Sequence, residues 1–296
     1  MEKTMKKALF LNISLLGLSF SQLAFAQQDT FDPVKFEQGL HYQHGQVSLL
    51  DQKVNLQIPA DLRYLDAADA QKLLEEGWGN PTDTEVLGML IPANTSPMSK
   101  TGWGVVITYQ EDGHISDKDA RRINYKNLLT DMQREVSSNN KARQDAGYPT
   151  IELIGWATMP KYDDLTHKMY WAKELSFGGD INHTLNYDVR VLGRTGVLNL
   201  NAVADMSQLD QIRDALPGML EGVAFTPGNR YEDFQAGKDK LAEYGLAALV
   251  AGGLGAAAAK TGFLTVILLL LKKFFVVVIA ALVGLFRLFT GRNQKA

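Results

Sequence analysis

The sequence predicts an α+β fold, in which an antiparallel sheet with flanking helices forms an exported domain and a transmembrane helical segment follows at the C-terminus. Consecutive strand-like runs lie between amphipathic, helix-like segments, and this order favours an antiparallel sheet over alternating βαβ units. An apolar N-terminal leader and an apolar C-terminal stretch without an acidic residue predict export and membrane anchoring.

The charge of this 296-residue chain is distributed unevenly, although its formal net value is only −3. Residues 1–26 carry a net charge of +2, residues 27–243 a net charge of −11 and residues 244–296 a net charge of +6. A domain this acidic repels phosphate, which argues against nucleic acid as a partner. The absence of cysteine excludes disulfides, thiolate metal sites and cysteine nucleophiles.

Residues 1–26 are typical of a cleaved signal peptide. Three lysines precede an apolar core over residues 8–20, and small residues at Ala24 and Ala26 predict cleavage after Ala26. The alternative is an uncleaved membrane anchor. The apolar core is, however, shorter than the ~20 residues that a transmembrane helix needs.

Residues 244–291 are predicted to form a hydrophobic membrane anchor, followed by a short basic tail over residues 292–296. One crossing over about 274–289 is favoured, preceded by a Gly/Ala-rich helix over 245–271. The alternative is two crossings that meet at two adjacent lysines, where the residues typical of turns are missing. The side chains expected at the membrane interface are Lys272, Lys273, Arg287 and Arg292.

The elements of the 27–243 domain begin with a β-hairpin over residues 47–58, where apolar runs flank a polar break. A short amphipathic helix follows over residues 66–76, with Asp66 as its N-cap. The next strands are predicted over residues 87–91 and 104–109.

A second helix, of roughly 20 residues, is predicted to begin at Asp117 or Asp119. A run of strands follows, in which residues 193–196 supply a hairpin turn. Ser207 is the predicted N-cap of the last helix. The strands of this part are predicted over residues 151–159, 167–177, 185–192, 197–204 and 223–225. One domain is the simpler assignment, and a division near Lys100 is the alternative.

Arg190 and Arg194 are the predicted contacts for a ligand or partner. Residues four apart on a strand point to the same face, so the two guanidinium groups form a basic spot that suits an anionic group. The alternative is ordinary pairing with the many acidic residues of the domain.

Residues 108–119 resemble half of a calcium-binding EF-hand loop, with Asp112 and Asp119 at ligand positions. Two carboxylates are too few for a typical calcium site, so a turn followed by an acidic helix cap is the favoured interpretation. His41 and His44 also lack a third zinc ligand nearby in the sequence. We therefore predict no metal and no cofactor.

Local catalytic motifs are missing from the sequence. It contains no nucleophile elbow, no phosphate-binding loop and no dinucleotide fingerprint, so no catalytic residue is assigned. A site assembled in space from histidines and carboxylates remains the alternative.

Several short motifs together resemble an uncharacterised family of membrane-anchored proteins of Gram-negative bacteria, domain of unknown function 2167. The resemblance covers nearly the whole mature chain and continues into the Gly/Ala-rich segment after Tyr244. It implies an exported, membrane-tethered protein and supplies no activity. The motifs are Gly-Trp-Gly-Asn-Pro at 77–81, Trp103 with Tyr-Gln-Glu-Asp-Gly at 109–113, Gly-Tyr-Pro at 147–149, Gly155 and Trp156 with Pro160, Tyr162 and Asp163, Trp171 with Ala172, Asn186 with Tyr187, and Leu-Gly-Arg-Thr-Gly-Val-Leu at 192–198.

The expected function is that of a non-catalytic binding or accessory protein of the cell envelope. The chain is expected in the inner membrane with its main domain in the periplasm, in contact with an envelope protein or with further copies of itself. The alternative is an envelope hydrolase that uses a histidine and carboxylates, and a third hypothesis is a metal-responsive module over residues 112–119.

Overall fold

The computed structural model describes residues 31–80, 86–145 and 147–252. The chain divides into two units, and the described helices and strands lie in the unit that begins at Pro33. The predicted signal peptide and almost all of the predicted anchor lie outside the described residues. Within the described ranges, no helix combines the length and the hydropathy that a membrane crossing requires.

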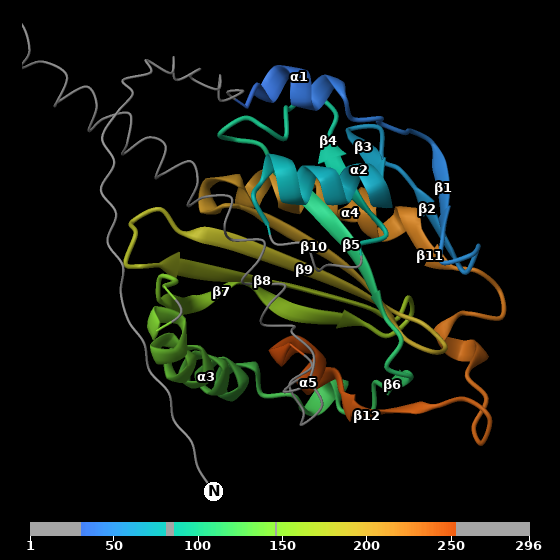
Figure 1. The fold of residues 1–296 in the computed structure, drawn as a ribbon. Coiled ribbons are helices and arrows are strands. Elements are labelled where there is room, and N and C mark those ends of the chain that lie inside the picture. The colour runs from blue at the N-terminus through green and yellow to red at the C-terminus, as the bar shows by residue number, and fades with distance from the viewer. Residues whose placement is uncertain (1–30, 81–85, 146, 253–296) are drawn as a thin grey trace, which may run out of the picture. The chain divides into compact units, whose positions relative to one another are not determined.

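A seven-stranded sheet, antiparallel at every strand pair, organises the fold (Figure 1). The predicted α+β class with an antiparallel sheet is therefore confirmed. In spatial order the strands are β3 (Leu62–Asp66), β4 (Gly88–Pro92), β5 (Gly104–Gln110), β10 (Val197–Asp205), β9 (Thr184–Leu192), β8 (Lys168–Phe177) and β7 (Ile151–Asp163).

One face of this sheet is covered by α4 (Leu209–Gly222) and by a three-stranded sheet of β1 (Gln46–Leu49), β2 (Val54–Gln57) and β11 (Val223–Phe225). Odd-numbered residues of β9, such as Leu185 and Val189, belong to the same apolar cluster as Ile212 and Leu216 of α4. This cluster is the main hydrophobic core.

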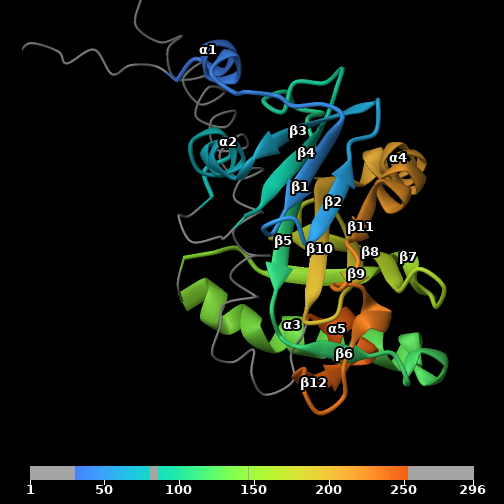
Figure 2. The same cartoon turned by 90° about the vertical axis from the view of Figure 1, so that its right-hand side faces the viewer.

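The opposite face carries α2 (Ala67–Lys72), α3 (Tyr125–Asp145) and α5 (Leu246–Ala251), and Figure 2 shows α4 and α3 on opposite sides of the sheet. All nine residues of β9 are buried, because the strand is covered on both faces. The remaining elements are α1 (Pro33–Gln38), η1 (Leu73–Gly77), η2 (Ala120–Arg122), η3 (Met206–Gln208), η4 (Tyr231–Asp233), and the parallel pair β6 (His114–Ser116) and β12 (Leu241–Gly245).

Helix α3 covers part of the free edge of β7. The Asn140 side chain accepts a hydrogen bond from the Ile151 amide at 2.8 Å and donates one to the Ile151 carbonyl at 2.9 Å. Gln133 Nε2 donates to the Leu153 carbonyl at 3.0 Å. The side-chain amides of α3 thus form hydrogen bonds with backbone groups of β7 that would otherwise be free to pair with a further strand.

Turns and helix caps could be predicted where the two residues that form the hydrogen bond lie close together in the sequence. Asp66 caps α2 by accepting from the Asp69 amide at 3.1 Å, as predicted. The hairpin turn after β9 is also confirmed, since the Gly193 amide donates to the Gly196 carbonyl at 2.8 Å. The predicted cap Ser207 is wrong, because Asp205 caps η3 and α4 follows from Leu209.

Two predicted boundaries differ from the structure. Helix α3 begins at Tyr125, not at Asp117 or Asp119, since the η2 turn intervenes and Asn124 accepts from the Asn127 amide. The fold also continues past residue 243 through β12 and α5. Of the predicted helix over 245–271, the structure describes α5, which Gly252 caps with a left-handed φ of 110°, and the rest lies outside the described residues.

Candidate functional site

The two arginines predicted to share a binding spot bind different aspartates. Arg190 lies on β9 and pairs with Asp188 at 2.9 Å, at 4% side-chain exposure. Arg194 lies beyond the end of β9, in the turn, and binds Asp239 through two nitrogens at 2.8 and 2.9 Å. Contact of either arginine with a ligand or partner remains a prediction.

Asp188 is the centre of a buried ionic cluster on the sheet. Its carboxylate lies 3.2 Å from Lys173 Nζ, 2.9 Å from Arg190 Nη2 and 2.8 Å from Asn201 Nδ2. Burial alone would raise the pKa of this carboxyl, but Lys173, Arg190 and Asn201 outweigh burial and hold the pKa below its usual value. The Arg190 guanidinium also lies 5.2 Å from the centre of the Trp171 ring.

The acidic turn that resembles an EF-hand binds protein groups. Asp112 accepts a hydrogen bond from the Tyr244 hydroxyl. Asp119 accepts from the amides of Leu246 and Ala247, at 3.1 Å each, and so caps α5. Across the described ranges, no three His, Asp or Glu side chains are grouped as metal ligands. The acidic turn therefore holds residues 240–247 against the domain through these hydrogen bonds, and we call it the clamp.

The histidines lie in different parts of the fold, and two of them contact the same aromatic ring. His41 pairs with Asp69 at 3.0 Å, and His44 is exposed. His183 pairs with Glu174. His114 and His167, in contrast, both lie against the Tyr231 ring, at centroid distances of 4.2 and 4.1 Å.

His167 sits at the end of the β7–β8 hairpin in a chain of hydrogen bonds. Tyr162 lies between Asp117 Oδ2, at 2.8 Å, and His167 Nδ1, at 2.9 Å. Burial and the neighbouring Asp117 raise the pKa of Tyr162, so this hydroxyl stays protonated and donates to Asp117. The tyrosine oxygen then accepts from His167 Nδ1–H. His167 adopts a left-handed φ of 52°, in the turn between β7 and β8.

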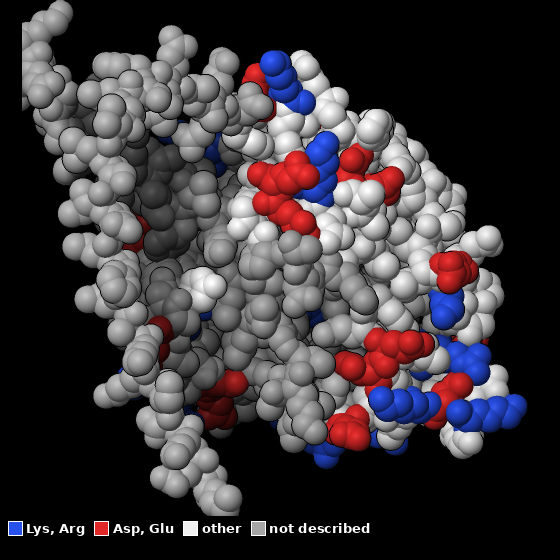
Figure 3. Space-filling view, viewed as in Figure 1, with Lys and Arg blue, Asp and Glu red and all other residues white. Residues whose placement is uncertain are grey.

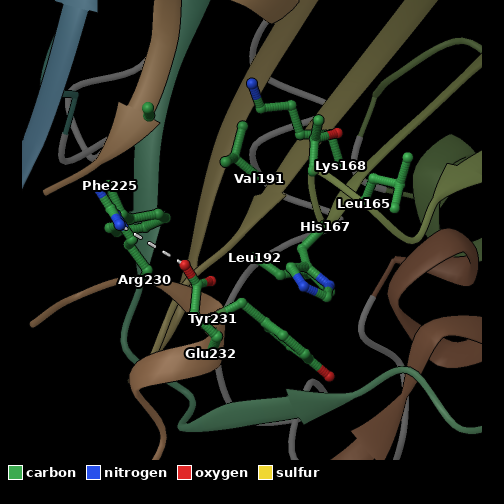
Figure 4. Close-up of a pocket in the computed structure, with 11 residues that line it drawn as sticks. Leu165, His167, Lys168, Val191, Leu192, Phe225, Arg230, Tyr231 and Glu232 are labelled. Atoms are coloured by element: carbon green, nitrogen blue, oxygen red, sulfur yellow. Dashed lines mark ion pairs between the residues drawn. The ribbon is translucent and has the colours of Figure 1, made fainter. Parts of the chain in front are cut away.

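Figure 4 shows a cavity beside this histidine, with a volume of about 230 Å³. His167 lies beside Leu192, with Tyr231 below it and Lys168 above it. Arg230 and Glu232, from the segment around η4, also line the cavity, with 3.9 Å between their charged groups.

A second cavity, which we name the α4 groove, lies between α4 and strands β7, β8 and β9. Its volume of about 580 Å³ is typical of small-molecule sites. It shares Thr166 and Lys168 with the first cavity. The lining residues are Thr158, Asp163, Thr166, Lys168, Tyr170, Tyr187, Arg213, Leu216, Pro217, Leu220 and Glu221.

One end of the α4 groove holds two buried hydroxyl groups, those of Tyr187 and Thr158. Tyr187 is only 2% exposed. Burial raises the pKa of Tyr187 to about 12, and a hydrogen bond with Thr158 and the charge of Arg213 counteract this only in part. The two hydroxyls therefore lie within reach of each other.

At the other end of the groove, the charged side chains already interact with other groups of the protein. Lys168 Nζ donates to the Leu220 carbonyl at the end of α4. Burial lowers the pKa of this ammonium, while Asp163 and Glu221 act in the opposite direction. The groove therefore has a hydroxyl-rich end near Arg213, an apolar middle and a mixed-charge end.

The sequence did not reveal these site residues. Tyr187 alternates with polar neighbours along β9 and has the pattern of an ordinary core residue. The sequence does show Thr-His-Lys at 166–168 as a short polar segment between two long strands. That this segment lines a cavity depends on its packing against α4 and against the segment around η4, which are distant in the sequence.

Comparisons with known proteins identify a family and no activity. A family model described as "Protein of unknown function (DUF2167)" matches residues 41–283. The search among curated proteins gave no match.

Solved structures give only weak similarities. PsbP (CyanoP) from Synechocystis sp. PCC 6803 has 11% identity and a TM-score of 0.35, covering 62% of this chain and 92% of that chain. LpqN, described as involved in cell envelope biogenesis of Mycobacterium tuberculosis, has 15% identity and a TM-score of 0.33, covering 67% and 99%. The Saccharomyces cerevisiae Ran-binding protein Mog1p has 9% identity and a TM-score of 0.34, covering 63% and 96%. TM-scores this low carry no argument about function.

Proposed function

We propose that this chain, which belongs to the DUF2167 family of proteins of unknown function, is a non-catalytic binding protein of the cell envelope. Its ligand occupies the α4 groove. The domain stands in the periplasm and is tethered to the inner membrane, as the signal-peptide pattern of residues 1–26 and the acid-free apolar stretch after Glu243 favour.

The observation that carries this proposal is the α4 groove itself, whose volume of about 580 Å³ and mostly apolar lining suit a small molecule. A small-molecule site combines apolar walls with a few polar groups that fix the orientation of the ligand. Arg213 and Lys168 supply charged groups at the two ends of this groove.

The charged surface is consistent with a small ligand in preference to a polyanion. On the face shown in Figure 3, acidic and basic side chains are interspersed over the described surface. A nucleic-acid site would instead gather lysines and arginines on one face.

A groove-filling substitution tests the binding function. Leu220→Trp places a large side chain at a half-buried groove position, and Asp214→Trp adds the same side chain at an exposed position of α4 outside the groove lining. We expect wild type and Asp214→Trp, purified from the inner-membrane fraction, to retain an organic molecule that Leu220→Trp has lost. Mass spectrometry of solvent extracts is the measurement. Identical extracts from all three proteins, or recovery of the wild type in the soluble fraction, would contradict the proposal.

A second candidate function, an envelope hydrolase, is favoured by the Asp117–Tyr162–His167 chain. The oriented imidazole has the geometry of a general base, and the adjoining cavity carries Lys168 and Arg230. If this function holds, His167→Asn lowers hydrolysis of chromogenic esters or phosphoesters by about 100-fold or more. His183→Asn, which changes a histidine that pairs with Glu174 and does not line this cavity, is the matched control and should retain activity. Wild-type rates equal to those of His167→Asn would exclude a hydrolase that uses this residue.

A further inference from the structure

We propose that residues 227–239, which we name the lid, open as one body and control access to the cavity beside His167. In the closed state that the structure describes, Tyr231 of the lid stacks on the His167 ring at a centroid distance of 4.1 Å. This inference concerns the smaller cavity and does not depend on what binds in the α4 groove.

The lid supplies one wall of this cavity (Figure 4). Arg230, Tyr231 and Glu232 line the cavity from the lid, and His167 and Lys168 line it from the end of the β7–β8 hairpin. The Tyr231 ring covers one face of the imidazole, and the His167 side chain is 22% exposed. A molecule can therefore stack on this face only after the lid has moved.

The lid contributes no side chain to the buried core. Every residue from 227 to 239 is half-buried or exposed. The strands on either side of it, in contrast, are held by buried side chains such as Phe225 and Ala242. Segments that bury little apolar surface open locally at a lower cost in free energy than the rest of a domain.

Hydrogen bonds within the lid make it a unit. The Asp233 carboxylate accepts from the amides of Gly228 and Arg230, at 2.7 and 2.9 Å. The Asp239 carboxylate accepts from the Gln235 amide at 2.7 Å. Because donor and acceptor both lie in the lid, these bonds persist when the lid moves away from the domain.

The chain is fixed to the domain just outside both ends of the lid. The Thr226 amide donates to the Lys53 carbonyl at 2.9 Å, and the His114 amide donates to the Lys240 carbonyl at 2.8 Å. The clamp holds the chain that follows. Movement is thus confined to the segment between these two attachments.

Two glycines near the ends of the lid suit hinges. Gly228 and Gly237 have positive φ values of 89° and 83°. A Cβ at either position would meet no other atom within 4 Å, so the backbone has room to turn. Hinges are a few loop residues of this kind that absorb changes in φ and ψ.

Arg194 holds the closed lid from the turn after β9. Its guanidinium binds the Asp239 carboxylate through two nitrogens, and its Nη1 donates to the Gly228 carbonyl at 3.1 Å. One side chain of the domain therefore holds both ends of the lid. The Arg194 side chain is 25% exposed, so this attachment lies at the surface.

Aromatic rings seat the middle of the lid on two histidines. The His114 ring stacks with both Tyr231 and Phe234, at centroid distances of 4.2 and 4.1 Å. The Tyr231 hydroxyl also donates to the Ile115 carbonyl at 2.9 Å. Ring contacts of this kind each add only a small amount to stability, so they position the lid without locking it.

Hydrogen exchange and histidine modification of the full-length chain in lipid nanodiscs, both read by mass spectrometry, test the lid. Arg194→Ala removes the attachment, and Arg194 does not line the cavity. We expect the lid amides to exchange about ten-fold faster. His167, whose ring is partly exposed in the closed state, should react with diethyl pyrocarbonate about three-fold faster. Exchange in the seven-stranded sheet should not change.

Two further variants and an internal reference complete the design. Arg134→Ala, at an exposed arginine that pairs with Asp131 on α3, is the matched control and should behave like wild type. Tyr231→Phe removes the hydroxyl bond, keeps the ring over His167, and should raise both rates as Arg194→Ala does. The exposed His44 should react equally in all four proteins.

Two results would overturn the proposal. Faster exchange of the lid with unchanged modification of His167 would show that the lid does not control the cavity. Faster exchange only next to Asp239 would show local fraying in place of movement as one body. Either result would leave ligand binding in the α4 groove unaffected.

Discussion

Replacing Asp188 with asparagine is expected to lower the free energy of unfolding by about 3–5 kcal/mol. Within the described residues, Asp188 is the only acidic residue that pairs with Lys173 and Arg190, and both cations are at least nine-tenths buried. Asparagine keeps the shape and removes the charge, which leaves two buried cations uncompensated. A loss of this size is a large fraction of the stability of a typical domain.

Urea unfolding of the full-length chain, followed by tryptophan fluorescence, measures this loss. Asp210→Asn is the matched control, because its partner Arg213 is exposed and the expected loss is below about 1 kcal/mol. A triple variant with Lys173→Met, Asp188→Leu and Arg190→Met removes all three charges and should recover most of the stability. Equal losses for the two Asp→Asn variants would show that the buried cluster does not behave as a charged unit.

The same substitution changes the response to acid. Because the pKa of Asp188 is below its usual value in the folded protein, its contribution to stability is fully present above about pH 4 and disappears as the pH falls through the lowered pKa. Asp188→Asn is therefore expected to unfold with a shallower pH dependence in the acid range than the wild type.

Replacing Asp119 with alanine is expected to free α5 from the body of the domain. The carboxylate accepts from two amides of α5, and loss of a helix cap costs about 1–2 kcal/mol. The helix has few other attachments: it is six residues long and is held mainly by the buried side chains of Leu246, Leu249 and Val250. We expect its amides to exchange with solvent about ten-fold faster.

Hydrogen exchange read by mass spectrometry resolves this local effect. Asp131→Ala is the control, since Asp131 pairs only with the exposed Arg134 three residues away. The expected result is faster exchange in α5 and β12 alone. Faster exchange across the whole seven-stranded sheet would show that Asp119 stabilises the entire domain and would contradict a local role in holding α5.

The sequence predicted features whose partners lie close in the chain. The cap at Asp66 and the turn after β9 both depend on residues a few positions apart, and local chemistry is enough to specify them. The predicted strand over residues 185–192 and the predicted turn over residues 193–196 are both confirmed, and they already place Arg194 in the turn, beyond the strand that carries Arg190.

The site could not be predicted because its partners are distant in sequence. Asp112 binds Tyr244 across 132 positions, so a loop that resembles a cation site is in fact a clamp. Tyr187 was visible as a strand residue, but its place in the α4 groove depends on how α4 packs against β7 and β9. Tertiary packing, and not local preference, decides both cases.

The covered edge of β7 has a consequence for the protein at high concentration. An open strand edge is a template onto which a second copy can add a strand. In this fold Asn140 and Gln133 of α3 occupy the first residues of β7, and register shifts and Pro160 interrupt the rest of the strand. At the other end of the sheet, Gln43 pairs with Tyr64 of β3 through two backbone hydrogen bonds. Copies of this protein at high concentration would therefore resist fibre-like aggregation through the edges of the described sheet.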